Sequence, residues 1–132
     1  LTDEVRVTQA DVRKIQLAKA PIAAGIQILL QEKDWKIKDI DQVILAGGFG
    51  SYMRKESAAE IGLIPKELVK CTHSVGNAAG EGAVSAALAS EARTELEQLQ
   101  KQMRYVELST HEAFSDIFIR EMSFTNSYMR SE

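Results

Sequence analysis

Two glycine-rich stretches contain the residues of this 132-residue sequence that are best suited to hold a ligand. The first, residues 47–50, has three glycines and follows a short apolar run at residues 43–45. The second, residues 75–83, also has three glycines. Glycine has no Cβ and tolerates positive φ, so the backbone N–H groups of such stretches can face a ligand closely. Taken alone, each stretch is typical of a tight turn between a strand and a helix.

The pairing of the two stretches is more specific than either one. Neither has the spacing of the dinucleotide fingerprint or of the phosphate loop that ends in Lys-Ser/Thr. Each, however, is expected to follow a strand and to lead into a helix. Ligands of α/β sheets bind outside the carboxyl ends of the strands, and helix N-termini favour phosphate. The pair therefore predicts two backbone-lined walls of a site that suits a phosphate-bearing ligand. If that ligand is a nucleotide, Phe49 is the aromatic candidate for contacting an adenine; alternatively, it is a core residue.

Among the elements that must position the first glycine stretch, the long helix before it has the clearest sequence signal. Thr8 and Asp11 form an approximate capping box, and apolar residues then recur with a period near 3.6 over residues 9–33. Pro21 lies inside this pattern and predicts a kink or a break, because proline removes one helical hydrogen bond. A strand over residues 42–46 follows, and Ser51 is expected to cap a short helix over residues 52–61.

The second half of the chain predicts a further alternation of strand and helix. We expect a strand over residues 67–72, an alanine-rich and then charged helix over residues 83–103, and a strand over residues 105–108. A second capping box, Ser109 to Glu112, is expected to open a last helix that ends near Met122. The fold class is therefore α/β, a sheet of three short strands packed by helices.

Composition excludes several classes of function. A net charge of −3 gives no basic footprint for nucleic acid, and no apolar run approaches the ~20 residues that span a bilayer. Cys71 is the one cysteine, so neither an internal disulfide nor an all-cysteine metal site is expected within the chain. Cys71 is expected to be a buried small hydrophobe, and His73 and His111 to lie at a strand end and in an exposed first helical turn. Cytoplasm is the expected compartment.

The residues also resemble a known family. VILAGGFGSY and, about thirty residues later, VGNAAGEGAVSAAL look like the adenosine motif and the second connecting motif of the actin, sugar kinase and heat-shock chaperone superfamily. Together with IQLAKAPIAAGIQILL, IGLIP and YVELSTHEAFSDIF, they resemble the C-terminal part of the ASKHA-domain iron–sulfur proteins that include the reductive activator of corrinoid proteins. The likeness covers about residues 5–124. It implies that residues 1–122 are one subdomain of an actin-like (ribonuclease-H-like) ATPase fold. Residues 123–132 are polar and are expected to form a flexible tail.

The resemblance also implies a function. Members of the family couple ATP hydrolysis to low-potential electron transfer and return an inactive corrinoid protein, or a similar metalloprotein, from Co(II) to Co(I). Electrons enter through an N-terminal ferredoxin-like iron–sulfur domain, which would lie upstream of Leu1 together with the phosphate loop. ATP and Mg²⁺ would bind between two lobes of the full-length protein. This chain would supply the adenosine-side wall, and it is expected to have no ATPase activity by itself.

The same resemblance assigns residues to the nucleotide. Gly47 and Gly48 match the glycine pair that passes over adenosine and the α-phosphate. Asn77 stands where superfamily members often have an acidic residue near the ribose or phosphates, and Gln16-x-x-Lys19 resembles a Glu-x-x-Lys helix signature that cups adenosine. The expected nucleotide-binding residues are Gln16, Lys19, Gly47, Gly48, Phe49, Gly76 and Asn77.

A function of another class is the alternative. The alanine-rich helix and the thin sheet edge also suit a non-catalytic interaction or dimerisation module in which the glycines only form turns. A homodimer through an unpaired strand edge is left open under either function. Nucleotide binding by the full-length protein distinguishes the two.

Overall fold

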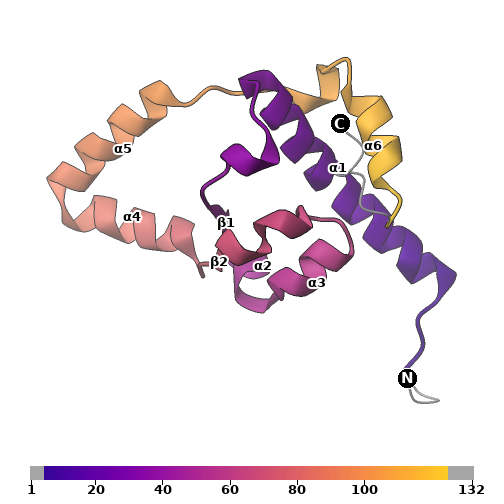
Figure 1. Ribbon diagram of the computed structural model, residues 1–132. Helices are drawn as coiled ribbons and strands as arrows, with labels where there is room; N and C mark the ends of the chain where they lie inside the picture. Colours follow the sequence, from indigo (N-terminus) through magenta and orange to yellow (C-terminus); the bar gives the residue numbers. More distant parts are fainter. Residues whose placement is uncertain (1–4, 125–132) are drawn as a thin grey trace.

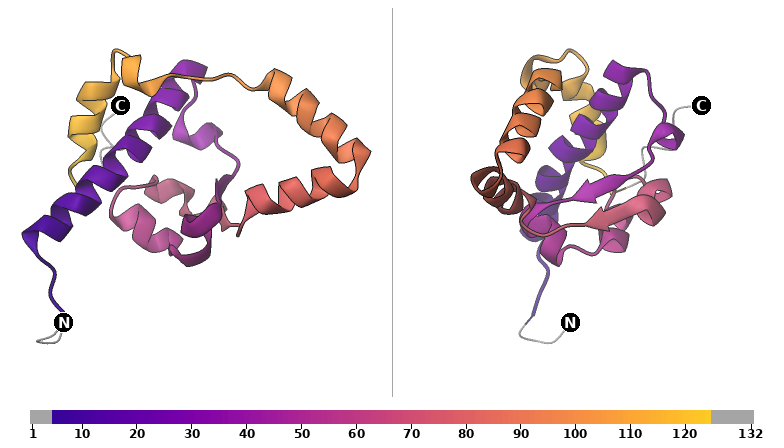
Figure 2. Two further views of the ribbon diagram at one scale, coloured as in Figure 1. Left: turned by 180° about the vertical axis from the view of Figure 1, so that it is seen from behind. Right: turned by 90° about the vertical axis from the view of Figure 1, so that its left-hand side faces the viewer.

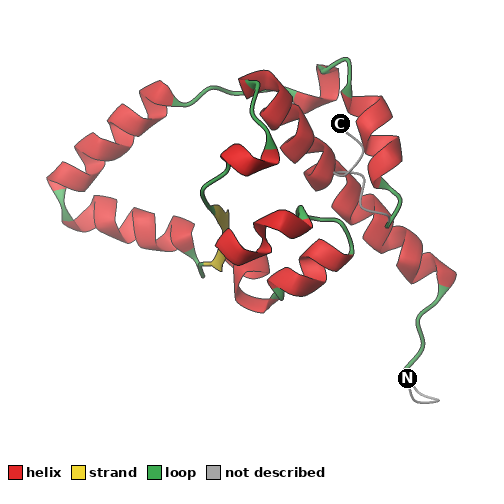
Figure 3. Cartoon of the chain, in the orientation of Figure 1, coloured by secondary structure: helices red, strands yellow, loops and turns green. Residues whose placement is uncertain are grey.

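A long N-terminal helix organises the computed structural model, which describes residues 5–124 (Figure 1). The last helix lies along it, a small sheet with short helices lies beside it, and two further helices form a V-shaped arm that projects away (Figures 1 and 2). Helix dominates the described chain, as Figure 3 shows. The helices are α1 (Gln9–Lys33), α2 (Gly47–Tyr52), α3 (Lys55–Glu60), α4 (Ala78–Leu88), α5 (Ser90–Gln102) and α6 (Phe114–Glu121). The strands are β1 (Val43–Leu45) and β2 (Thr72–Ser74), and the 3₁₀ helices are η1 (Ile37–Asp39), η2 (Lys66–Cys71) and η3 (Leu108–Thr110).

Helix α1 begins at the predicted capping box. The amide of Asp11 donates to the Thr8 hydroxyl at 3.2 Å, and the amide of Thr8 donates to the Asp11 carboxylate at 3.0 Å. The helix continues through Pro21, so of the two predicted alternatives, a kink or a break, the break does not occur. Proline removes one hydrogen bond, but Ala20 and Ala24 on either side of it are fully buried, and this packing keeps both halves of the helix in one element.

The sheet has two parallel strands within residues 5–124, with Val43 paired to Thr72 and Leu45 to Ser74. The strand predicted over residues 67–72 is wrong, because the chain forms η2 there and extends only from Thr72. Local hydrogen bonds favour the tighter turn. The amide of Leu68 donates to the Pro65 carbonyl at 3.1 Å, and the Thr72 hydroxyl donates to the Leu68 carbonyl at 2.7 Å.

The strand predicted over residues 105–108 is also wrong. The chain is irregular there and then forms η3. The carboxylate of Glu107 accepts the amide of Ser109 at 3.1 Å and its hydroxyl at 2.6 Å, which turns the backbone instead of extending it. The same turn uses Ser109, so the predicted second capping box does not form, and α6 begins later, at Phe114.

Two predicted helices each divide in two. The chain enters helix directly after β1, so α2 and α3 replace the helix expected over residues 52–61, and Ser51 lies inside α2 with its hydroxyl donating to the Gly47 carbonyl at 3.3 Å. The helix expected over residues 83–103 starts earlier, at Ala78, and is interrupted at Ala89, whose φ of −133° and ψ of 128° are extended. Nothing in the local sequence explains that interruption.

The core consists of two small apolar clusters. One, formed by Ala58, Ala59, Leu63 and Ile64, lies under α3 and the turn that follows it. The other joins α1 to α6 through Ala24, Ile28 and Ile117. Phe114 and Phe118 pack against this second cluster, with their ring centroids 5.8 Å apart. No residue of α4 or α5 is buried.

Two further expectations concern the C-terminal tail and membrane-spanning helices. Of the tail predicted over residues 123–132, residues 125–132 lie outside the described residues. Among the helices described between residues 5 and 124, none has the length and apolar character needed to cross a bilayer.

Candidate nucleotide-binding edge

The two glycine stretches meet at the carboxyl end of the sheet. The amide of Val75 donates to the Leu45 carbonyl at 2.8 Å, and the amide of Gly47 donates to the Gly76 carbonyl at 2.8 Å. These bonds continue the parallel pairing of β1 with β2, whose arrows lie side by side in Figure 2. The structure thus brings together Gly47, Gly48, Gly76 and Asn77, which we call the glycine edge.

A helix begins on each side of the glycine edge. Helix α2 starts at Gly47, whose backbone φ of +73° is rarely adopted by residues that have a side chain. Helix α4 starts after Asn77, whose side-chain oxygen accepts the amide of Gly80 at 3.0 Å. Asn77 therefore acts as an N-cap. In the first turn of α4 the amide of Ala78 donates to the Gly76 carbonyl at 2.9 Å, which leaves the amide of Ala79 as the further first-turn donor that can face an anionic group.

Two glycines of the edge differ from the neighbouring Gly50 in what surrounds them. A Cβ built on Gly48 or on Gly76 would meet no atom within 4 Å, so both positions are open to a ligand. A Cβ on Gly50 would overlap the carbonyl oxygens of Leu45 and Val75. Gly48 and Gly76 are therefore free to take part in binding, whereas Gly50 is required for α2 to pack on the strand ends.

Lys19 lies elsewhere, in the contact between α1 and α6. It is only 2% exposed, and its Nζ is 3.7 Å from Oε2 of Glu121. Burial lowers the pKa of the Lys19 ammonium, and the charge of Glu121 opposes that shift. The Lys19 ammonium is thus not among the groups that the glycine edge presents.

The remaining predicted site residues are less defined. Gln16 is half-buried in the N-terminal half of α1, three residues before Lys19. Phe49 belongs to α2, but its side chain lies outside what the structure describes, so its contact with an adenine stays a prediction.

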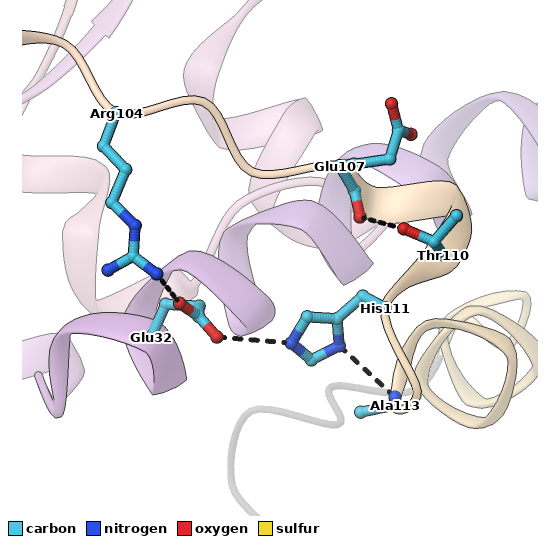
Figure 4. A network of polar contacts seen from close by, with 6 residues as sticks. All are labelled: Glu32, Arg104, Glu107, Thr110, His111 and Ala113. Carbon is cyan, nitrogen blue, oxygen red and sulfur yellow. Dashed lines mark hydrogen bonds and ion pairs between the residues drawn. The ribbon is translucent and has the colours of Figure 1, made fainter.

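A polar network that the sequence did not predict connects the end of α1 to the segment after α5 (Figure 4). Glu32 accepts from Arg104 at 2.8 Å and lies 3.6 Å from Nε2 of His111. The amide of Ala113 donates to Nδ1 of His111 at 3.3 Å, which leaves the proton of a neutral imidazole on Nε2, facing Glu32. The expectation of an exposed His111 in a helical turn is therefore wrong: its side chain is 19% exposed and follows η3.

Cys71 and the metal-binding residue types form no further site in the described chain. Cys71 is half-buried at the end of η2, where its Sγ donates to the Leu68 carbonyl at 3.3 Å. His73 is exposed on β2. Over residues 5–124 the structure gathers no group of three or more histidine, cysteine, aspartate and glutamate side chains that could hold a metal ion.

Comparison with known proteins identifies close similarities over nearly the whole chain. A family model described as the C-terminal domain of RACo, the ASKHA domain, matches residues 1–131. The corrinoid activation enzyme RamQ of Eubacterium limosum is 32% identical over 126 residues, which are 96% of this chain and 21% of that protein. A solved structure of a reductive activator for corrinoid, iron-sulfur protein is 38% identical with a TM-score of 0.78, over 86% of this chain and 18% of that one. The chain thus spans about a fifth of the length of these two relatives.

Proposed function

The chain belongs to the RACo C-terminal ASKHA domain family, and on this premise we propose that it forms the adenosine-side wall of an ATP-binding cleft. Residues 1–122 would be the C-terminal subdomain that carries this wall. The fold, with a small parallel sheet among helices, is that of an ASKHA-domain reductive activator. The glycine edge is the part of the subdomain that we assign to the nucleotide.

The observation that carries this proposal is the joining of two open glycine turns at the carboxyl end of parallel strands. The hydrogen bond of 2.8 Å between Gly47 and Gly76 makes the two turns one continuous backbone surface. Because a Cβ built on Gly48 or Gly76 would meet no atom within 4 Å, the adenosine and its first phosphate can approach that backbone directly. The amide of Ala79, in the first turn of α4 behind Asn77, adds a donor for a ribose or phosphate oxygen.

We assign metal binding and electron transfer to parts of the full-length protein outside this chain. The described residues gather no carboxylate cluster for a metal, so Mg²⁺ would be held with the triphosphate by the opposite lobe. The iron–sulfur cluster would lie in an N-terminal domain of the full-length protein. The two relatives are named as a corrinoid activation enzyme and a reductive activator for a corrinoid, iron-sulfur protein. By extension, the full-length protein would use ATP in the cytoplasm to drive electron transfer to a corrinoid or similar metalloprotein, and this chain alone would not hydrolyse ATP.

A thermal-shift experiment on the full-length protein tests the proposal. ATP or ADP should raise the melting temperature of the wild type, and Gly48→Val should abolish this increase by covering the backbone. Gly82→Val is the matched control, because a Cβ there also meets nothing within 4 Å but the position lies inside α4, away from its first residue. The control should keep the nucleotide effect.

Two results would contradict the proposal. If Gly48→Val keeps the full nucleotide-dependent shift, the glycine edge does not contact the nucleotide. ATP hydrolysis at enzyme rates by the isolated 132-residue chain would show that the second lobe is not needed.

A second candidate is the non-catalytic interaction module, and the arm formed by α4 and α5 favours it. Leu88 is 83% exposed and Met103, directly after α5, is 79% exposed, so the arm offers apolar side chains to a partner. Melting of the wild-type full-length protein at the same temperature with and without nucleotide would support this function over the first. Neither function requires a homodimer.

A further inference from the structure

The contact between α1 and α6 contains a buried ionic cluster within an otherwise apolar surface. The side chains of Lys19 and Glu121 are each 1% exposed, with 3.7 Å between Nζ and Oε2. The other carboxylate oxygen, Oε1 of Glu121, accepts a hydrogen bond of 2.6 Å from the amide of Gln27. One carboxylate on α6 is thus held by two side chains of α1.

Stability alone does not account for such a cluster. Removing two charges from water costs several kcal/mol per ion, and well-packed apolar residues of similar volume are often as stabilising as a buried ion pair. The separation of 3.7 Å is also longer than a strong charge-assisted hydrogen bond of about 2.8 Å. Another property of the contact must therefore depend on the cluster.

The apolar surface under α6 gives little positional information. On α1 the residues of this apolar cluster are Ala24 and Ile28, both fully buried, and of these two only Ile28 has a side chain long enough to fit between the residues of a facing helix. Hydrophobic attraction is also non-directional. A short helix could therefore slide on this surface by one turn, about 5.4 Å, and still bury apolar side chains.

We propose that the cluster of Lys19, Gln27 and Glu121 fixes the position of α6 along α1. Lys19 and Gln27 lie two helical turns apart on one side of α1, with Ala23 between them. Glu121 reaches both only when α6 sits at one position along the axis. A slide of one turn would carry the carboxylate away from one partner and leave a buried charge uncompensated. The cluster acts as a positioning device, because it selects one docked arrangement among several that have similar apolar contacts.

The test uses the full-length protein with 4-fluorophenylalanine placed at Phe118, which packs beside Phe114 on the covered side of α6. The ¹⁹F spectrum then reports how many docked arrangements exist, and hydrogen exchange of the α6 amides reports how firmly the helix is held. Glu121→Gln leaves Lys19 buried without an opposite charge and should speed α6 exchange on the order of a hundredfold. Lys19→Met with Glu121→Leu should restore exchange to within about tenfold of the wild type but split or shift the single ¹⁹F resonance.

A matched control comes from an exposed ion pair. Lys66 and Glu60 are 2.9 Å apart with side chains 42% and 72% exposed, so Lys66→Met should change neither readout. The proposal is overturned if the double variant gives one ¹⁹F resonance at the wild-type position, because α6 then finds its place without the cluster. Equally, rapid α6 exchange in the double variant would show that the cluster is needed for stability and not for position, and unchanged exchange in Glu121→Gln would show that Lys19 does not depend on its partner.

Discussion

Gly50 is the position at which one added methyl group should most affect the candidate site. It is buried where α2 turns onto the end of the sheet, and a Cβ there would overlap the carbonyl oxygens of Leu45 and Val75. It would also come within 2.8 Å of the Leu45 carbonyl carbon, whereas two carbons pack at about 3.5–4.0 Å. All of these atoms belong to the backbone, so no side-chain rotation can relieve the contact. Gly50→Ala must therefore move α2 away from the strand ends.

Two effects of Gly50→Ala have opposite signs. Alanine is favoured over glycine in a helix by about 1 kcal/mol, which would stabilise α2. Overpacking of a close contact costs about 1–3 kcal/mol and occasionally more, and here two strand ends are displaced at once. We expect the clash to dominate, with a net loss of about 2 kcal/mol of unfolding free energy and a loss of nucleotide binding.

Gly48→Ala provides the matched comparison, since it places the same methyl group in the same short helix. A Cβ on Gly48 meets no atom within 4 Å, so only the gain in helix propensity of up to about 1 kcal/mol applies. Denaturant unfolding followed by circular dichroism measures both variants. Equal stability of Gly50→Ala and the wild type, or a less stable Gly48→Ala, would refute the assignment of Gly50 to packing and Gly48 to open surface.

Two further predictions concern the contacts of α1. Hydrogen bonds that Thr8 donates, mainly from its hydroxyl, lower the pKa of the Asp11 carboxyl below its ordinary value of 3.8. The stabilisation that the Asp11 carboxylate gives to the folded state is therefore present at neutral pH and is lost as pH falls through this lowered pKa. Asp11→Asn should therefore lower the melting temperature at pH 7 but not well below pH 3.8, and an equal decrease at both would contradict the capping role. Ile117 is 1% exposed and Ile119 is 61% exposed, so Ile117→Ala should cost about 2–5 kcal/mol and Ile119→Ala less than about 0.5 kcal/mol in denaturant unfolding. Similar losses for both would show that α6 is not docked through Ile117.

The parts of the fold that depend on neighbouring residues could be predicted from the sequence. The capping box at Thr8, the long helix after it and the strand that ends before Gly47 each depend on contacts within a few residues. The strand predicted at residues 67–72 failed because Pro65 and the Thr72 hydroxyl favour a 3₁₀ turn, and periodicity does not record such hydrogen bonds. The interruption at Ala89 has no local signal at all.

The candidate site was predictable in part for the same reason. Glycines after two strands indicate turns, and parallel strands place such turns at one edge, so the meeting of Gly47 with Gly76 follows from pattern and topology. The sequence does not show which glycine is open and which is packed, because that depends on carbonyl groups from two separate segments around Gly50. The burial of Lys19 could not be predicted either, since its partner Glu121 comes from the other end of the chain.

The pairing of the first helix with the last has a consequence for synthesis on the ribosome. The hydrogen bond from Gln27 to Glu121 spans 94 residues, which take roughly 5 to 20 seconds to translate at about 5–20 residues per second. During that interval α6 does not yet exist, and Ala24 and Ile28 of α1 have no partner from this contact. The domain can therefore complete its second core cluster only after Ile117 has left the ribosome.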